Sequence, residues 1–229
     1  MNELEIKKPQ CLGFIMDGNR RWAKEQGLPT LEGHQKGLDV FLDIVRYVRD
    51  EKIPHAVFYA FSTENWKRTE DEVSYLMTLF SSLLTRLSED LEERKVGVRI
   101  VGRRQDFSEH LQKQMADLEE KSLKYTNTTI WIALSYGGRA EIIEGVNQAI
   151  KNGTEVNEES FEKLLWTTDL PDPDMIVRTS GEERLSNFLT WKSVYSEFYF
   201  IEKHWPALTK DDFKDILLQY EKRQRRHGA

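Results

Sequence analysis

A short polar segment near the amino terminus combines one acid with two neighbouring cations. An apolar run ends abruptly at Asp17, and the chain continues with Gly18, Asn19, Arg20 and Arg21. Cations in the first turn of a helix are unfavourable unless an anion is bound there, and guanidinium groups match phosphate geometry. A carboxylate beside a phosphate is suited to hold Mg²⁺. The segment therefore predicts a site in which Asp17 holds the metal and the following residues hold a diphosphate; the alternative is that Asp17 only caps the next helix.

Two further polar segments could contribute to an anion site. Segment 61–68 (FSTENWKR) carries hydroxyl, acidic, amide and cationic groups, and its alternative is a turn in which Asn65 caps the next helix. Segment 178–184 (RTSGEER) places two arginines around Ser180 and Gly181. That arrangement suits a loop whose backbone approaches an anion, although the P-loop pattern is missing.

Two single residues also need a partner. His34, in EGHQKG, either donates to a phosphate or makes a structural hydrogen bond. Glu197 lies in the strand-like run YSEFYF, where an inward carboxylate requires a cation or a metal.

Short apolar runs alternate with helical patterns along the chain, and these elements must position the polar residues. Runs rich in branched and aromatic residues predict strands at 11–16, 56–61, 96–102, 128–134 and 175–179, with segment 189–201 as a candidate for another. Helical spacing of apolar positions predicts helices at 34–51, 70–95, 107–125, 139–152 and 209–226. This alternation predicts an α/β fold with a mostly parallel central sheet flanked by helices. Ligands of such sheets bind beyond the carboxyl ends of the strands, where Asp17 and the two polar segments fall.

The bulk composition favours a single domain spanning residues 1–229. The chain has 33 lysines and arginines against 39 aspartates and glutamates, a net charge of −6 that argues against a broad nucleic-acid surface but not against a small anionic substrate. Cys11 is the only cysteine, so neither an intrachain disulfide nor a thiolate zinc site is expected. The charged N-terminal segment is unlike a secretory signal, and no apolar stretch reaches the roughly 18 residues of a membrane span, so a cytoplasmic location is expected.

The predicted helix at 70–95 has an apolar band broader than one contact stripe. Core packing is the default explanation. The alternative is that part of the band lines a cavity for a long apolar substrate. A phosphate site beside such a cavity would suit an amphiphile with an anionic head and a hydrocarbon tail.

Six motifs in a fixed order resemble those of the cis-prenyltransferases, above all the bacterial enzymes that make undecaprenyl diphosphate. They are MDGNRRWA, GHQKG, YAFSTENWKR, YGGR, RTSGEERLSNFLTW and YSEFYF. The resemblance extends from about residue 10 to the end of the chain, and the ordered series makes it specific, since any one motif alone would be weak.

The resemblance implies an enzyme that condenses isopentenyl diphosphate onto an allylic diphosphate such as farnesyl diphosphate, repeatedly and with Mg²⁺, to make a Z-polyprenyl diphosphate. It also implies a parallel sheet with surrounding helices, a hydrophobic tunnel for the growing chain, and a homodimer. Undecaprenyl diphosphate, a cell-wall lipid carrier, is the default product. Because a polyprenyl product is insoluble in water, peripheral contact with the inner face of the membrane is a further expectation.

The same resemblance assigns roles to individual residues. Asp17 corresponds to the catalytic aspartate that assists the metal and the departing diphosphate, Asn65 to a proposed proton acceptor, and Glu197 to a second metal-associated acid. The allylic diphosphate would be held by Gly18, Asn19, Arg20, Arg21, Trp22 and His34. The second substrate-binding motif corresponds to Ser62, Thr63, Glu64, Trp66 and Arg68. The isopentenyl diphosphate site corresponds to Arg178, Arg184, Leu185 and Ser186. Asn65 has an alternative role, because a carboxamide is a feeble base: it would position groups while the released diphosphate takes the proton.

Several positions depart from the family pattern, and they bear on product length. Arg20 and Ser180 stand where relatives usually have glycine. Thr30 stands in place of a usual arginine, and Glu183 in place of a frequent histidine. Trp131 and Leu134 add bulk to a strand that borders the tunnel in relatives, whereas Ala60 stays small. The alternatives to an undecaprenyl synthase are therefore a short-chain synthase, a non-catalytic partner subunit of a heteromeric enzyme, and a Mg²⁺-dependent phosphohydrolase. The last would need a water-activating base beside Asp17, and the sequence offers none adjacent to it.

Overall fold

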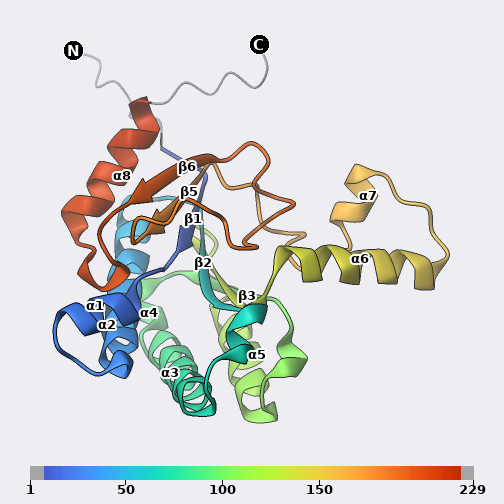
Figure 1. Cartoon of the computed structure of the whole chain (residues 1–229). Helices are drawn as coiled ribbons and strands as arrows, with labels where there is room; N and C mark the ends of the chain where they lie inside the picture. Colours follow the sequence, from blue (N-terminus) through green and yellow to red (C-terminus); the bar gives the residue numbers. More distant parts are fainter. Residues whose placement is uncertain (1–7, 223–229) are drawn as a thin grey trace, which may run out of the picture.

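Six parallel strands form the central sheet of the computed structural model, which describes residues 8–222 (Figure 1). The strands are β1 (Cys11–Ile15), β2 (His55–Ser62), β3 (Gly97–Val101), β4 (Thr129–Tyr136), β5 (Met175–Thr179) and β6 (Glu197–Ile201). Their order is β3-β4-β2-β1-β5-β6, and every neighbouring pair is parallel. All residues of β1 and β5 are buried, which explains why the inner strands are continuous apolar runs. The predicted mostly parallel α/β sheet is confirmed.

The segment at 189–201 was predicted as a candidate strand, and only its last five residues form one, as β6. The chain between β5 and β6 forms turns, in which Ser186, Asn187 and Leu189 have positive φ angles. Local hydrogen bonds satisfy this turn: the N–H of Phe188 donates to the carbonyl of Leu185, and the N–H of Ser193 donates to that of Leu189. These turns replace the amino-terminal part of the predicted strand.

Helices connect the strands and cover the sheet. They are α1 (Asn19–Glu25), α2 (Thr30–Asp50), α3 (Glu70–Glu89), α4 (Leu91–Arg94), α5 (Glu109–Ser122), α6 (Gly138–Asn152), α7 (Glu158–Glu162) and α8 (Lys210–Lys222). Short 3-10 turns add η1 (Thr63–Lys67), η2 (Arg104–Asp106) and η3 (Trp205–Ala207). The prediction of a single helix at 70–95 is wrong at its carboxyl end. The helix breaks at Asp90, and Lys95 adopts a left-handed conformation.

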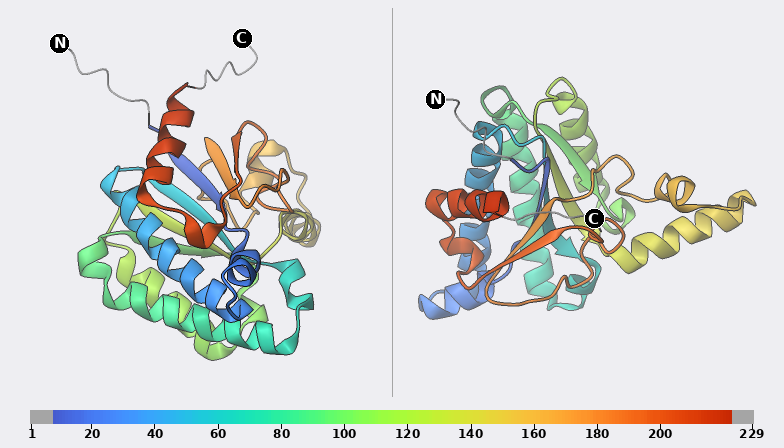
Figure 2. Two further views of the ribbon diagram at one scale, coloured as in Figure 1. Left: turned by 60° about the vertical axis from the view of Figure 1, so that its left-hand side comes forward. Right: turned by 90° about the horizontal axis from the view of Figure 1, so that it is seen from above.

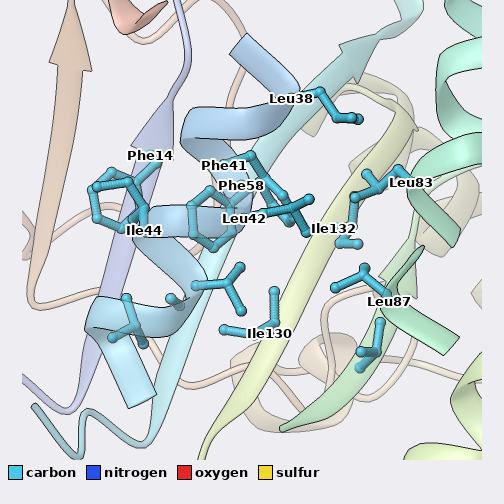
Figure 3. Packing of buried hydrophobic residues seen from close by; sticks show 14 of the residues in the cluster. Phe14, Leu38, Phe41, Leu42, Ile44, Phe58, Leu83, Leu87, Ile130 and Ile132 are labelled. Carbon is cyan, nitrogen blue, oxygen red and sulfur yellow. The ribbon is translucent and has the colours of Figure 1, made fainter. Parts of the chain in front are cut away.

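The main core lies between one face of the sheet and α2, α3, α5 and α8. Figure 3 shows strand residues meeting helix residues there, and the labelled ones are Phe14, Leu38, Phe41, Leu42, Ile44, Phe58, Leu83, Leu87, Ile130 and Ile132. A smaller cluster covers the other face and includes Trp131, Tyr136 and Phe188. In Figures 1 and 2, α6 and α7 project away from the body of the molecule. Within residues 8–222, the helices fall short of the length and apolar character that crossing a membrane requires.

Candidate active site

A pocket of about 550 Å³ opens at the carboxyl ends of β1, β2 and β5. Strand ends of a parallel sheet meet at one edge, so residues distant in sequence converge there. The predicted site residues that line it are Asp17, Asn19, His34, Ser62, Glu64, Asn65, Arg68, Arg178 and Ser186. A second hollow of about 310 Å³ adjoins it and adds Gly18, Arg20 and Arg21.

Asp17 lies between two guanidinium groups. Its Oδ2 accepts from Arg178 Nη2 at 2.8 Å, and its Oδ1 lies 3.1 Å from Arg21 Nη2. Burial alone would raise the pKa of this carboxyl, but the hydrogen bond and charge of Arg178, together with Arg21, outweigh burial and lower the pKa below its usual value. Gly18 provides the N-cap of α1, with no side-chain cap, so the helix-capping alternative for Asp17 is wrong.

The arginines of the second loop are tied into the same cluster. Arg178 is almost fully buried, and it donates to Ser186 Oγ at 2.8 Å and to the carbonyl of Arg184. Arg21 Nη1 donates to the carbonyl of Ser180 and to Glu182 Oε1, both at 3.1 Å. Arg184 forms an ion pair with Glu182 as well. The loop after β5 is therefore joined to α1 through Arg21.

Glu72 is a member of the site that the sequence reasoning missed. Its carboxylate lies 3.0 Å from Arg68, 3.2 Å from His34 Nε2 and 3.7 Å from Arg20. Burial lowers the pKa of His34, and the hydrogen bond that His34 donates to Glu72 only partly offsets this effect. The available signal was the spacing of four residues between Arg68 and Glu72 across the start of α3.

Asn65 shapes the segment in front of α3. Its Oδ1 accepts from the backbone N–H of Ser62 at 3.1 Å and completes a capping box for η1. The cap of α3 is instead Thr69, whose hydroxyl accepts from the N–H of Glu72. The alternative in which Asn65 caps α3 is therefore wrong, and Asn65 instead takes part in the capping box of η1, whose N-cap is Ser62.

Some predicted residues lie outside both hollows. Trp66 donates from Nε1 to Ser135 Oγ at 2.8 Å and packs on Phe61. It therefore anchors segment 61–68 to β4 and does not line the pocket. The other predicted residues that line neither hollow are Trp22, Thr63, Arg184, Leu185 and Glu197. Glu197 begins β6 opposite Met175, whereas Asp17 follows the other end of β1, so the fold of a single chain does not bring these two acids together.

A narrow apolar recess of about 80 Å³ adjoins the main pocket between α2 and α3. The two cavities share Met16, Asn19, His34, Tyr59, Ala60 and Leu76. The rest of the recess is lined by Gly37 and by apolar side chains, namely Leu38, Phe41, Leu79, Phe80, Leu83 and Trp205. Among residues 8–222, the recess does not extend into a continuous hydrophobic tunnel. Trp131 packs on the opposite face of the sheet, with its Nε1 3.2 Å from His55 Nδ1, so its bulk does not obstruct the recess.

The residues of the pocket suit a magnesium ion that would be held mainly by the phosphates of a bound substrate. Among residues 8–222, no group of three or more acidic, histidine or cysteine side chains could hold a metal by itself. Mg²⁺ commonly binds one or two carboxylates together with substrate phosphates and waters. Asp17, with cations around it that attract phosphate, fits this mode.

Comparisons with known proteins place the chain in a family. A family described as "Putative undecaprenyl diphosphate synthase" matches residues 15–228. The chain belongs to this prenyltransferase family. An isoprenyl transferase of Thermotoga maritima is 45% identical to this prenyltransferase, over 98% of each chain. A Micrococcus luteus enzyme named ditrans,polycis-undecaprenyl-diphosphate synthase ((2E,6E)-farnesyl-diphosphate specific) is 41% identical, over 96% of this chain and 92% of the relative.

Solved structures show the same fold as this prenyltransferase. Lavandulyl diphosphate synthase from Lavandula x intermedia, in complex with dimethylallyl diphosphate, matches with a TM-score of 0.92 and 30% identity, over 97% of this chain and 99% of the other. A probable undecaprenyl diphosphate synthase from Campylobacter jejuni matches with a TM-score of 0.82 and 31% identity, over 97% and 100% of the two chains.

Proposed function

We propose that this prenyltransferase condenses isopentenyl diphosphate onto an allylic diphosphate, with farnesyl diphosphate as the first candidate, to make a Z-polyprenyl diphosphate. The observation that carries the proposal is a cluster of arginines around Asp17 that opens directly onto an apolar recess. An anionic head and a hydrocarbon tail fit these two parts. The name of the Micrococcus luteus relative, which specifies (2E,6E)-farnesyl diphosphate, supports farnesyl diphosphate as the primer.

In the proposed reaction, the bond between C1 of the allylic substrate and its diphosphate breaks. The double bond of isopentenyl diphosphate attacks C1, and a proton leaves the new unit. Negative charge grows on the departing diphosphate, and Arg21, beside Asp17, would stabilise it, while Arg178 would bind the diphosphate of the incoming isopentenyl unit. Asp17 would hold Mg²⁺, which supplies further positive charge to the phosphate oxygens when bound.

Asn65 has a positioning role in this proposal. Its Oδ1 is occupied by the Ser62 N–H, and a neutral carboxamide is a weak base. The departing diphosphate therefore takes the proton. An Asn65→Ala variant with an unchanged rate for a single condensation would contradict any role of Asn65 in the reaction.

Undecaprenyl diphosphate is the proposed product, and a shorter product is the second candidate. The small volume of the recess favours the second candidate, because a long chain requires α2 and α3 to move apart. The named product of the Micrococcus luteus relative favours the first.

We also propose a cytoplasmic homodimer that releases its product at a membrane surface. Exposed apolar side chains of α6 and of the turn before β6 supply a surface for a second copy, and they are Ile143, Val146, Ile150, Val194 and Tyr195. The metal role predicted for Glu197 requires this second copy, because one protomer keeps Glu197 and Asp17 at opposite ends of the sheet.

The test is incubation of the purified protein with farnesyl diphosphate, labelled isopentenyl diphosphate and Mg²⁺, followed by chain-length analysis of the extracted products. A ladder ending near eleven units is expected. A product one or two units longer than the primer would establish the short-chain alternative. No product with any allylic primer would overturn the proposed function.

A further inference from the structure

A hydrogen-bonded chain of three side chains lies behind the Asp17–Gly18 turn. Ser180 Oγ lies 2.6 Å from His204 Nδ1, and His204 Nε2 lies 2.9 Å from Glu25 Oε1. The three residues come from the loop after β5, the segment before η3 and the end of α1. The chain therefore joins three segments that are distant in sequence.

The direction of these hydrogen bonds follows from the groups involved. A carboxylate only accepts hydrogen bonds, so the proton of a neutral His204 lies on Nε2 and is donated to Glu25. Nδ1 is then an acceptor, and the hydroxyl of Ser180 donates to it. In this tautomer the hydroxyl of Ser180 points toward His204.

The Ser180–His204 pair fills the space behind Gly18. A Cβ atom on Gly18 would lie 2.7 Å from both Ser180 Oγ and His204 Nδ1, and Gly18 has a φ angle of +102°. The neighbouring backbone is held from the same side, because the Asp17 carbonyl accepts from Thr179 Oγ1 at 2.7 Å and from the Trp205 N–H at 3.0 Å. These contacts leave the turn little room to shift.

The Ser180 backbone also holds Arg21. Its carbonyl accepts from Arg21 Nη1 at 3.1 Å, and its N–H donates to the carbonyl of Lys203 at 3.0 Å. Ser180 has a φ angle of +80°, a conformation that glycine adopts far more readily than serine. A hydroxyl is therefore present where the backbone alone favours glycine, and His204 is the partner that uses it.

We propose that Ser180, His204 and Glu25 form a positioning relay that fixes Asp17 and Arg21 for diphosphate binding. Ser180 and His204 line neither hollow of the site in residues 8–222, so they act through the turn and not on the ligand. The proposal rests on the proposed function in one respect, that the bound anion is the diphosphate of a prenyl substrate.

The first test is a Ser180→Gly variant, which removes the hydroxyl and relieves the positive φ angle. Its melting temperature is expected to equal or exceed that of the wild type, since glycine suits this conformation. Its affinity for inorganic diphosphate, measured by titration calorimetry with Mg²⁺, is expected to fall about tenfold, and kcat by a similar factor, because small misplacements in a site are costly. An affinity equal to that of the wild type would overturn the relay.

Lys95→Gly is the matched control. Lys95 is an exposed residue with a φ angle of +51° after α4, so this change relieves a similar backbone conformation away from the pocket. Diphosphate affinity and kcat are expected to stay unchanged. If both variants lose affinity equally, backbone relief and not the lost hydroxyl is the cause, which would contradict the proposal.

The second test uses His204→Leu and His204→Asn, each with and without Ser180→Gly. The asparagine amide oxygen can replace Nδ1 as the acceptor for Ser180, so His204→Asn is expected to retain most diphosphate affinity while His204→Leu loses it. This difference is expected to vanish when combined with Ser180→Gly, because groups acting as a unit give non-additive effects. Effects that simply multiply would overturn the relay.

The two readouts separate the relay from the proposed function. If diphosphate affinity follows the expected pattern but the wild type forms no prenyl product, the proposed function fails and the relay stands. If the wild type forms product and all variants match it in affinity and kcat, the function stands and the relay fails.

Discussion

Asp17 is held by charged partners on both of its carboxylate oxygens. Two guanidinium groups hold its carboxylate, and together they lower its pKa despite partial burial. A sequence can indicate an acid followed by cations, but it does not show that Arg178, 161 positions away, is the nearer partner. The pairing depends on β1 and β5 being neighbours in the sheet.

Replacing Asp17 with asparagine is expected to lower single-turnover product formation about a thousandfold, on the scale of losing a main electrostatic group of an active site. The measurement is a rapid-quench assay with labelled isopentenyl diphosphate. Asp43→Asn is the control, because Asp43 forms an exposed ion pair with Arg46 on α2. A near-normal rate in Asp17→Asn would contradict the assignment of Asp17.

The same variant has an expected pH signature. The folded-state pKa of Asp17 lies below the usual 3.8, so its ionised form stabilises the fold above that value. This contribution is lost as the pH falls through the lower, folded-state pKa. The difference in unfolding free energy between wild type and Asp17→Asn should therefore be largest above pH 4 and shrink below it. A difference that grows with acid would show that the pKa is not lowered.

At the scale of elements, Glu72 joins α1, α2 and the segment before α3 through Arg20, His34 and Arg68. Glu72 raises the pKa of His34 against the effect of burial. Glu72→Gln is therefore expected to lower the pKa of His34 further, as measured by NMR titration of the imidazole. Glu32→Gln, in the first turn of the same helix as His34, is the control. A rise in the His34 pKa would contradict this account.

A buried network joins β4 and α6. Glu141 accepts from Thr167 N at 2.9 Å and Oγ1 at 2.7 Å, and from the Tyr136 hydroxyl at 2.5 Å. Burial raises the pKa of Glu141. Its contribution to stability is thus fully present below pH 4.5 and is lost as the pH rises through the higher, folded-state pKa.

Glu141→Gln keeps an acceptor and removes the charge, so at pH 8 it is expected to be at least as stable as the wild type. Glu141→Ala leaves buried donors without a partner and should cost about 1–3 kcal/mol. Both values come from denaturant unfolding, with the exposed Glu155→Gln as the control. A Glu141→Gln protein much less stable than the wild type at pH 8 would show that the charge itself is needed.

The elements were predictable to different degrees. The five main strands follow from branched and aromatic runs, because both faces of an inner parallel strand are buried. The break at Asp90 and the turn around Asn187 were not predictable in this way. Both depend on packing and local hydrogen bonds that apolar spacing does not encode. Glu72 was missed for the same reason, since its partners come from three separate segments.

At the scale of the whole molecule, the projecting α6 carries several exposed apolar side chains, and Ile150 is 72% exposed (Figure 1). A dimer through this helix is expected to be visible as twice the chain mass in sedimentation velocity. Ile150→Asp should shift the protein to a monomer. Leu218→Asp, at an exposed apolar position on α8, should not. A wild type that is monomeric at micromolar concentration would contradict the dimer.

The arginines of the site are already paired with carboxylates of the same chain. Asp17, Glu72 and Glu182 occupy Arg20, Arg21, Arg68, Arg178 and Arg184. Binding an anion is therefore an exchange, in which the ligand must displace acids that are already in contact. A diphosphate has more charge and more acceptor oxygens than a monovalent anion such as chloride, so it is better suited to compete in this exchange. On the proposed function, a bound diphosphate would take over these arginines, and the carboxylates released in the exchange would then be free to hold a metal ion beside it.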